Sequence, residues 1–483
     1  MLFTAPSFLF VFLPVVLLLH LIPRPVWRNS LLLVASLVFY ASGAGAFTSL
    51  IVTSIVVNYV AALAVDRHRG TPAGRWLLWA TIAANLAVLA VCKYAGFLGE
   101  NLNALSAALG GSTFAVPVIT LPIGISFFTF HAISYVVDVA RRDAVAQKGP
   151  VEAALYLLFF PQLIAGPIIR YREIADQLPV RTVRVDDLAY GIRRFIIGLA
   201  KKMLIANTVA APADHIFSLA AADLTAATAW LGVVCYTLQI YFDFSGYSDM
   251  ALGLGRMFGF RFPENFRYPY VATSVQDFWR RWHLSLSAWF RDYLYVPLGG
   301  NRVRPARVYL NLVTVFALCG LWHGANWTFV AWGLFHGAFL VIERAVGARR
   351  TATSPLTRAA GHLYALLVVM IGWVLFRADS LADAGHVFVA MAGGATAVAP
   401  AFDAAWYLTP EVVAALAAGV VGATPVGPAL AARLLRGPGA ADASAVMPAA
   451  ASLVVVATCV VLLAASVLLS AAGTYSPFIY FRF

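Results

Sequence analysis

Long apolar stretches, rather than alternating apolar and polar positions, dominate this chain. A helix that crosses a bilayer needs about 20 predominantly apolar residues, whereas a strand of an outer-membrane barrel shows about 10 residues of alternating hydrophobicity. The uninterrupted stretches fit only the helical pattern. They lie at residues 5–22, 29–43, 46–65, 76–97, 119–140, 151–169, 188–208, 226–247, 308–342, 360–377, 409–432 and 447–472. With 308–342 counted as a hairpin, the pattern predicts an all-α polytopic membrane protein with about 11–13 membrane-embedded helices, some of them re-entrant.

The composition supports an integral membrane protein. Of the 483 residues, 61% are hydrophobic and only 12% are charged, and the mean hydropathy is +0.81. This balance lies well outside that of soluble domains. The first apolar segment follows no basic residue and runs into Pro23 without a cleavage site, so we expect a retained helix rather than a signal peptide.

The distribution of Lys and Arg predicts how the chain is oriented. Basic residues follow the first span at 24–28 and the third at 67–75, whereas none occurs in 98–118, 209–225 or 378–432. Basic loops face the cytoplasm, so the N-terminus is expected outside. We interpret the net charge of +12 as orientation and lipid contact rather than as a nucleic-acid surface.

A single membrane domain, residues 1–483, accounts for the chain, because the sequence shows no fixed-period repeat and no independent soluble domain. Within it we distinguish N-terminal helices (1–140), a core with the chemistry-bearing motifs (150–345) and C-terminal helices (355–483). The four cysteines lie in apolar stretches without metal-ligand spacing, and the sequence has no P-loop or zinc-hydrolase motif. We therefore expect no metal and no permanently bound cofactor.

The strongest sign of chemistry is a histidine inside an apolar stretch. His323 lies in the segment Gly-Leu-Trp-His-Gly-Ala-Asn-Trp at 320–327, and apolar residues continue on both sides. Ionisable groups at membrane depth are costly and mark functional sites by default. Burial disfavours the imidazolium, and the neutral ring is the form that accepts a proton. The flanking glycines, Gly320 and Gly324, allow close backbone approach or a helix break; a structural histidine bonded to a carbonyl is the alternative.

A second histidine lies in a segment rich in Trp and Arg. If residues 275–293 form one helix, the large apolar side chains, Trp282 among them, gather on one face and the arginines on the other. His283 then lies at the seam, where it can meet the reactive end of a charged ligand. Such a helix lies at a membrane surface or lines a funnel. The alternative is a structural histidine that holds this helix in place.

The segment 239–249 carries polar side chains to the end of a span. It begins with Gln239 and contains two carboxylates, Asp243 and Asp249, close in sequence to Arg256. These groups could shape the mouth of a tunnel. A structural role is the favoured interpretation, because acids paired with arginines stabilise helix packing without chemistry.

Together these segments resemble the membrane-bound O-acyltransferase family, and within it the bacterial branch of alginate O-acetylation membrane proteins. The resemblance covers nearly the whole chain. Besides the two histidine segments, it rests on residues 165–171, 198–202, 243–255, 291–302 and 477–483. An ordered series of this length is specific, unlike any single motif.

The resemblance implies tilted, interfacial and re-entrant helices around a central funnel or tunnel, with His323 as the catalytic base and His283 as the second signature residue. It implies an O-acetyltransferase of the bacterial inner membrane that uses cytoplasmic acetyl-CoA, a thioester, as co-substrate. The acetyl group then passes to a periplasmic partner acetyltransferase or directly to a polysaccharide such as alginate. Arginines suit the phosphates of coenzyme A. The residues expected to contact the donor or the reacting oxygen are Arg256, Arg280, Arg281, Arg291, Trp282, Trp322, Asn326, Gln239 and Asp243.

Other functions stay open from the sequence. A relative within the family transfers D-alanine from a carrier protein to teichoic acid, and peptidoglycan is another acceptor for O-acetylation. A non-catalytic transporter or scaffold is the alternative from a different class, since intramembrane histidines also serve proton relays. Transporters often show an inverted repeat, and none is visible here.

Overall fold

The computed structural model describes residues 1–22, 25–347, 354–394, 402–435 and 449–473. Within these ranges the chain is helical and contains no strand, which confirms the predicted all-α class. The N-terminal helices are α1 (Leu13–Leu21), α2 (Pro25–Ala44), α3 (Thr48–Arg67), α4 (Pro72–Ala108) and α5 (Ile125–Arg141).

The middle of the chain forms the largest group of helices. These are α6 (Pro150–Leu158), α7 (Phe160–Leu163), α8 (Tyr171–Ile174), α9 (Val185–Ala200), α10 (Asn207–Phe217), α11 (Ala226–Met257), α12 (Val275–Trp279), α13 (Leu284–Phe290), α14 (Pro305–His323) and α15 (Trp327–Ala345). The C-terminal helices are α16 (Pro355–Arg377), α17 (Leu381–Met391), α18 (Ala404–Tyr407), α19 (Pro410–Gly422), α20 (Val426–Leu435) and α21 (Ala449–Ala471).

Six helices or helix runs of the described chain are long and apolar enough to cross a membrane. They are Trp27–Arg67, Pro72–Ala108, Val185–Phe217, Pro305–His323, Pro355–Arg377 and Ala449–Ala471, and α19 with α20 makes a seventh if that pair, bent by 72°, is one span. Other predicted spans are shorter, such as Phe8–Leu21 and Pro150–Leu163. The chain is therefore a multi-pass membrane protein that combines long spans with shorter, broken helices.

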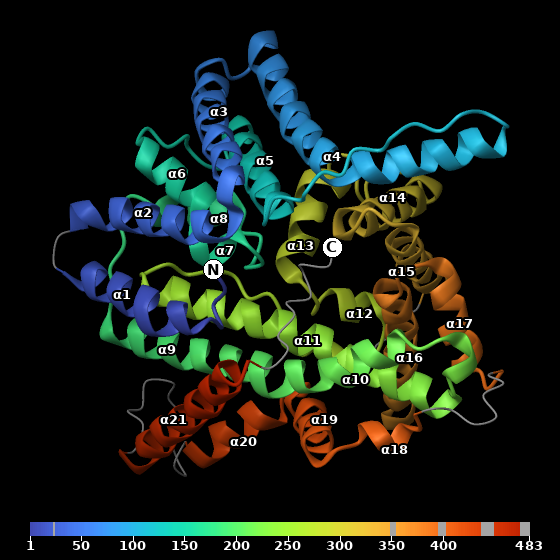
Figure 1. The fold of residues 1–483 in the computed structure, drawn as a ribbon. Coiled ribbons are helices and arrows are strands. Elements are labelled where there is room, and N and C mark those ends of the chain that lie inside the picture. The colour runs from blue at the N-terminus through green and yellow to red at the C-terminus, as the bar shows by residue number, and fades with distance from the viewer. Residues whose placement is uncertain (23–24, 348–353, 395–401, 436–448, 474–483) are drawn as a thin grey trace.

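The long helix α11 lies in the middle of the bundle (Figure 1). It packs along α9 so closely that the two backbones touch at glycines: a Cβ on Gly198 would lie 2.5 Å from the carbonyl oxygen of Gly246, and one on Gly191 would lie 2.6 Å from that of Gly253. Small residues permit this approach, which is typical of membrane helix pairs. The N-terminal helices lie on one side of α11, α14–α17 on the other, and α19–α21 along α9 and α10 (Figure 1).

The predicted single helix over 275–293 is wrong. The chain forms α12, breaks at residues 280–283, and continues as α13 and a π-helical turn, Arg291–Tyr295. Long-range backbone bonds explain the break, because the amide of Arg267 donates to the carbonyl of Arg281 at 2.9 Å and the amide of Leu284 to that of Asn265 at 3.0 Å. These contacts override the local helical pattern, and His283 adopts a left-handed conformation with φ 43°.

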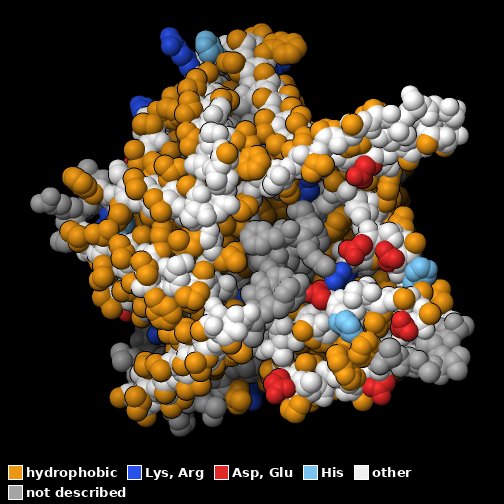
Figure 2. Space-filling model, in the orientation of Figure 1, with side chains coloured by type: hydrophobic (Ala, Val, Ile, Leu, Met, Phe, Trp, Pro, Cys, Tyr) orange, Lys and Arg blue, Asp and Glu red, His pale blue; other side chains and the backbone are white. Residues whose placement is uncertain are grey.

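Hydrophobic side chains cover much of the face seen in Figure 2. Figure 2 shows one face whose periphery is covered with hydrophobic side chains, with scattered acidic groups and few Lys or Arg. An apolar periphery is what a protein surrounded by lipid presents.

Candidate active site

His323 is the last residue of α14, where the helix stops. Gly324 has an extended backbone, and Asn326 begins α15 as its N-cap, with its side-chain oxygen accepting from the amide of Thr328 at 3.0 Å. Gly320 lets α14 and α15 pack tightly, because a Cβ there would collide with the carbonyl of Phe329. The predicted hairpin over 308–342 and the helix break beside His323 are thus confirmed.

Aromatic rings enclose the imidazole of His323. Its ring centre lies 5.0 Å from that of Trp322, 5.2 Å from that of Trp332 and 5.1 Å from that of Phe376, all at steep angles. Only 5% of the residue is exposed. Water is therefore largely excluded from the ring, which strengthens every electrostatic interaction made there.

His283 is buried in a polar setting. Its Nδ1 lies 3.1 Å from Oδ1 of Asn265, an atom that only accepts, so Nδ1 carries the proton and Nε2 the lone pair. The hydroxyl of Ser285 donates to the same oxygen at 2.9 Å, and the Asn265 amide donates to Ser248 at 3.0 Å. Burial lowers the pKa of His283 to about 3, so the ring is neutral at physiological pH.

Both histidine rings lie near the indole of Trp322. The Trp322 ring lies 5.0 Å from the His323 ring and 6.3 Å from the His283 ring, centre to centre. The Nε1 of Trp322 is buried and has no hydrogen-bond partner among the described residues. Segments forty residues apart in the sequence therefore form one buried site.

Apart from the arginines, three of the other predicted contact residues have partners within the protein, whereas the side-chain oxygen of the buried Gln239 has none among the described residues. Trp282 is buried against Phe278 and Trp373, and Asp243 forms an ion pair with Lys202 at 2.9 Å. The side-chain nitrogen of Asn326 donates to the carbonyl of Asp379 at 2.8 Å. The favoured structural interpretation of the acids fits this pairing, although Lys202 rather than a nearby arginine is the partner of Asp243.

Three of the four predicted donor-binding arginines are engaged in ion pairs. Arg256 pairs with Asp187 at 2.5 Å, Arg281 with Asp277 at 2.9 Å and Arg291 with Asp292 at 2.7 Å. Arg280 is exposed. A role for the paired arginines in binding phosphate groups would require exchange of these carboxylate partners.

Asp292 joins three arginines, a cluster that the sequence did not reveal. Arg170 and Arg172 both bind the carboxylate that Arg291 also binds. Burial alone would raise the pKa of the Asp292 carboxyl, but the three guanidinium groups hold it below its usual range. The cluster links α8 to the turn after α13.

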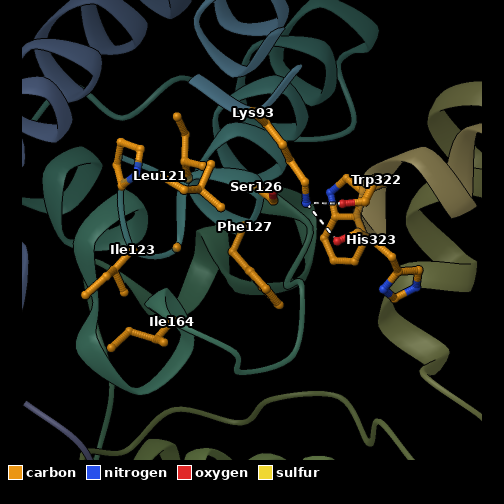
Figure 3. A pocket seen from close by; sticks show the side chains of 11 residues that line it. Lys93, Leu121, Ile123, Ser126, Phe127, Ile164, Trp322 and His323 are labelled. Atoms are coloured by element: carbon orange, nitrogen blue, oxygen red, sulfur yellow. Dashed lines mark hydrogen bonds between the residues drawn. The ribbon is translucent and has the colours of Figure 1, made fainter. Parts of the chain in front are cut away.

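A cavity of about 110 Å³ reaches the backbone of His323 from the side of α4 and α5. Its lining includes Lys93, Ser126, Phe127 and Trp322. Figure 3 shows the Lys93 side chain reaching the carbonyls of Trp322 and His323, while the imidazole turns away from the cavity. The sequence analysis missed Lys93. Like His323, it is an ionisable residue within an apolar stretch, 76–97, where burying a charge in the membrane is energetically costly.

The described residues contain no group of three His, Cys, Asp or Glu side chains that could hold a metal ion. The expectation that no metal takes part stays a prediction.

Sequence comparison identifies the class of protein. The family model of the membrane-bound O-acyltransferases matches residues 76–382, which include both histidines. The chain therefore belongs to this family, and it is an acyltransferase, as the resemblance predicted.

The relatives that align with most of the chain are named for O-acetyl transfer. The chain is similar to the probable alginate O-acetylase AlgI of Azotobacter vinelandii, at 48% identity over 81% of this chain and 78% of the relative. It is 38% identical to the peptidoglycan O-acetyltransferase of Helicobacter pylori, over 81% of this chain and 80% of the relative. The teichoic acid D-alanyltransferase of Bacillus subtilis is 32% identical over 45% of this chain and 58% of the relative.

Proposed function

We propose that this protein transfers an acetyl group from a cytoplasmic thioester, acetyl-CoA, to an extracytoplasmic polysaccharide such as alginate, directly or through a periplasmic partner. The observation that carries the proposal is the meeting of two buried histidines at Trp322, at the end of a membrane helix. The names of the most similar relatives support the acetyl group and the polysaccharide. The direction of transfer follows from the basic loops, which are expected in the cytoplasm.

In the proposed reaction His323 is the general base. A ring nitrogen takes the proton of the acceptor hydroxyl, and the oxygen forms a bond to the thioester carbonyl carbon. The carbon–sulfur bond then breaks, and the thiolate leaves with the bonding electrons. The imidazolium returns its proton to the thiolate or to water. General-base catalysis of this kind contributes about 10² to 10⁴ in rate.

The tetrahedral intermediate needs a hydrogen-bond donor for its oxyanion. Two other donors near His323 are already engaged: the side-chain nitrogen of Asn326 donates to the carbonyl of Asp379 at 2.8 Å, and Nε1 of Trp327 donates to Asn101 at 2.8 Å. Nε1 of Trp322 lacks a partner among the described residues and lies on a ring that contacts His323. This geometry supports Trp322 as the oxyanion donor, with the ring of His283 6.3 Å from the indole, centre to centre.

Replacement of His323 tests the proposal. His323→Ala is expected to abolish acetylation of the polymer, measured as ester content, while the detergent-purified protein still unfolds in one cooperative thermal transition, at a lower temperature because a buried ring is lost. His386→Ala, at an exposed position on α17, is the matched control and should retain parental ester content. Parental acetylation by folded His323→Ala protein would exclude this histidine as the base.

The donor is tested by thermal shift. A ligand that binds only the folded protein raises its melting temperature, so acetyl-CoA should produce a concentration-dependent increase. A D-alanyl-loaded carrier protein is the comparison. An increase with the carrier alone would contradict acetyl-CoA and favour D-alanyl transfer.

A further inference from the structure

The last turn of α14 is held by side chains from α4. The final carbonyls of a helix have no partner within the helix. Here Nζ of Lys93 donates to the carbonyls of Trp322 at 2.6 Å and of His323 at 2.9 Å. The hydroxyl of Tyr94 donates to the carbonyl of Leu321 at 2.7 Å. Three consecutive carbonyls are therefore satisfied by two adjacent residues more than 200 positions earlier in the chain.

The C-terminal end of α14 stabilises the charge of Lys93. Lys93 lies within Pro72–Ala108, a candidate membrane span, where an ammonium group is costly. No carboxylate among the described residues forms an ion pair with it. The C-terminus of a helix carries partial negative charge from its aligned peptide dipoles. The two carbonyls thus supply both the hydrogen bonds and the negative potential that a half-buried ammonium requires.

The chain after His323 supplies one backbone bond to the last turn, from the amide of Gly324 to the carbonyl of Gly320 at 3.2 Å, and so leaves the carbonyls of residues 321–323 to other partners. Gly324 leaves the helix with an extended backbone, φ −161° and ψ 151°, and has no side chain to pack. Helix ends without caps fray. Since His323 is the last helical residue, any fraying would move its imidazole relative to Trp332 and Phe376.

We propose that Lys93, assisted by Tyr94, is the positioning residue for His323 in acetyl transfer. The inference rests on the proposed role of His323 as base. Lys93 does not touch the reacting atoms: Figure 3 shows its Nζ on the backbone carbonyls, with the imidazole on the far side of the helix end. It acts through the backbone, by fixing the direction in which the ring projects. Catalytic groups must be held within about 0.5 Å of their productive geometry, and a 1 Å misplacement costs about 10²-fold in rate.

Substitution of Lys93 separates positioning from substrate binding. Lys93→Met removes the donor and the charge but keeps the apolar stem, and is expected to lower kcat by about 10- to 100-fold with little change in the KM for the donor. Lys93→Arg keeps charge and donors and should restore the larger part of kcat. Tyr94→Phe loses one bond and should have a smaller effect. Lys148→Met, at an exposed position, is the matched control and should behave as the parent.

Two outcomes of the kinetics overturn the inference. A raised KM with parental kcat in Lys93→Met would make the ammonium a substrate contact through the cavity that it lines. Parental kcat and KM in Lys93→Met, with His323→Ala inactive, would leave Lys93 without a role in the reaction.

Hydrogen exchange tests the inference independently of the activity. In Lys93→Met, the amides of residues 321–324 should exchange faster than in the parent and in Lys148→Met, because the last turn loses two bonds. Exchange at the parental rate would show that the bonds from Lys93 do not stabilise the last turn of α14, and would refute the inference whatever the activity of the variant. If the amides exchange faster in Lys93→Met but neither the parent nor the variant acetylates any polymer, Lys93 still stabilises the helix end. In that case the proposed function, rather than the role of Lys93, is wrong.

Discussion

At the scale of single residues, the two histidines differ in what surrounds them. His323 is enclosed by aromatic rings, whereas His283 donates to Asn265 and keeps a lone pair on Nε2. A histidine whose tautomer is fixed by a neighbour presents one defined nitrogen to a ligand. The indole of Trp322 lies near both rings and carries an N–H that has no hydrogen-bond partner among the described residues.

Replacement of Trp322 tests its role as oxyanion donor. Trp322→Phe keeps an aromatic ring against both histidines but removes the N–H, and should lower kcat by about 10²- to 10³-fold, the usual cost of one lost oxyanion donor. Single-turnover acetylation by purified protein measures this. Trp327→Phe is the control, since its N–H binds Asn101 instead. Equal losses in the two variants would point to packing rather than to the N–H.

The sequence revealed part of this site for a physical reason. A lone imidazole in an apolar stretch is costly, so His323 was identified from its neighbours in the chain alone. Asn265 could not be found that way, because its bonds to His283 and Ser285 exist only after a distant segment folds back. Lys93 carried the same signal as His323, but its carbonyl partners on α14 could not be read from a linear pattern.

At the scale of elements, long spans were predictable and broken helices were not. The hairpin of α14 and α15 follows from two apolar stretches around a glycine-containing break. The segment 275–293 has a helical apolar pattern and nevertheless splits into α12 and α13, because backbone bonds to residues 265–267 compete with it. Periodicity reports which side chains are buried, and tertiary hydrogen bonds decide whether the helix continues.

The contact between α9 and α11 yields a prediction at this scale. Gly198→Ala would place a Cβ against the backbone of α11, which cannot move aside, and should destabilise the protein by about 1–3 kcal/mol. Gly385→Ala, in α17 with open space around it, should instead be neutral or stabilise by about 0.5–1 kcal/mol. Melting temperatures in detergent compare the two. A loss of the same size at both positions would argue against close packing of α9 on α11.

At the scale of the whole molecule, ion pairs join segments that are far apart in the chain. Asp292 gathers Arg170, Arg172 and Arg291, and Arg194 pairs with Asp249 at 2.7 Å. Removing one member of such a cluster leaves a charge on its partner without a counter-charge. The resulting loss of folding stability is larger than the stability that the intact ion pair contributes.

The Asp292 cluster predicts how stability depends on pH. A carboxyl whose pKa is lower in the folded than in the unfolded protein stabilises the fold above its unfolded pKa, and this contribution is lost as the pH falls through the folded pKa. The melting temperature should therefore decrease below about pH 4. The Asp292→Asn variant should have a lower melting temperature than the parent at neutral pH, and its melting temperature should fall less steeply as the pH is lowered. Parallel curves for the parent and the variant would show that Asp292 does not contribute to the acid sensitivity.

The bonds from Lys93 and Tyr94 to the end of α14 have a consequence for dissecting the chain. Residues 150–345 contain both histidines, yet the side chains that secure the last turn before Gly324 come from α4. A fragment that starts after α5 would thus carry the reacting groups without their support. Fragment complementation, with residues 1–140 supplied as a separate polypeptide, would then recover turnover only when α4 docks on α14 again.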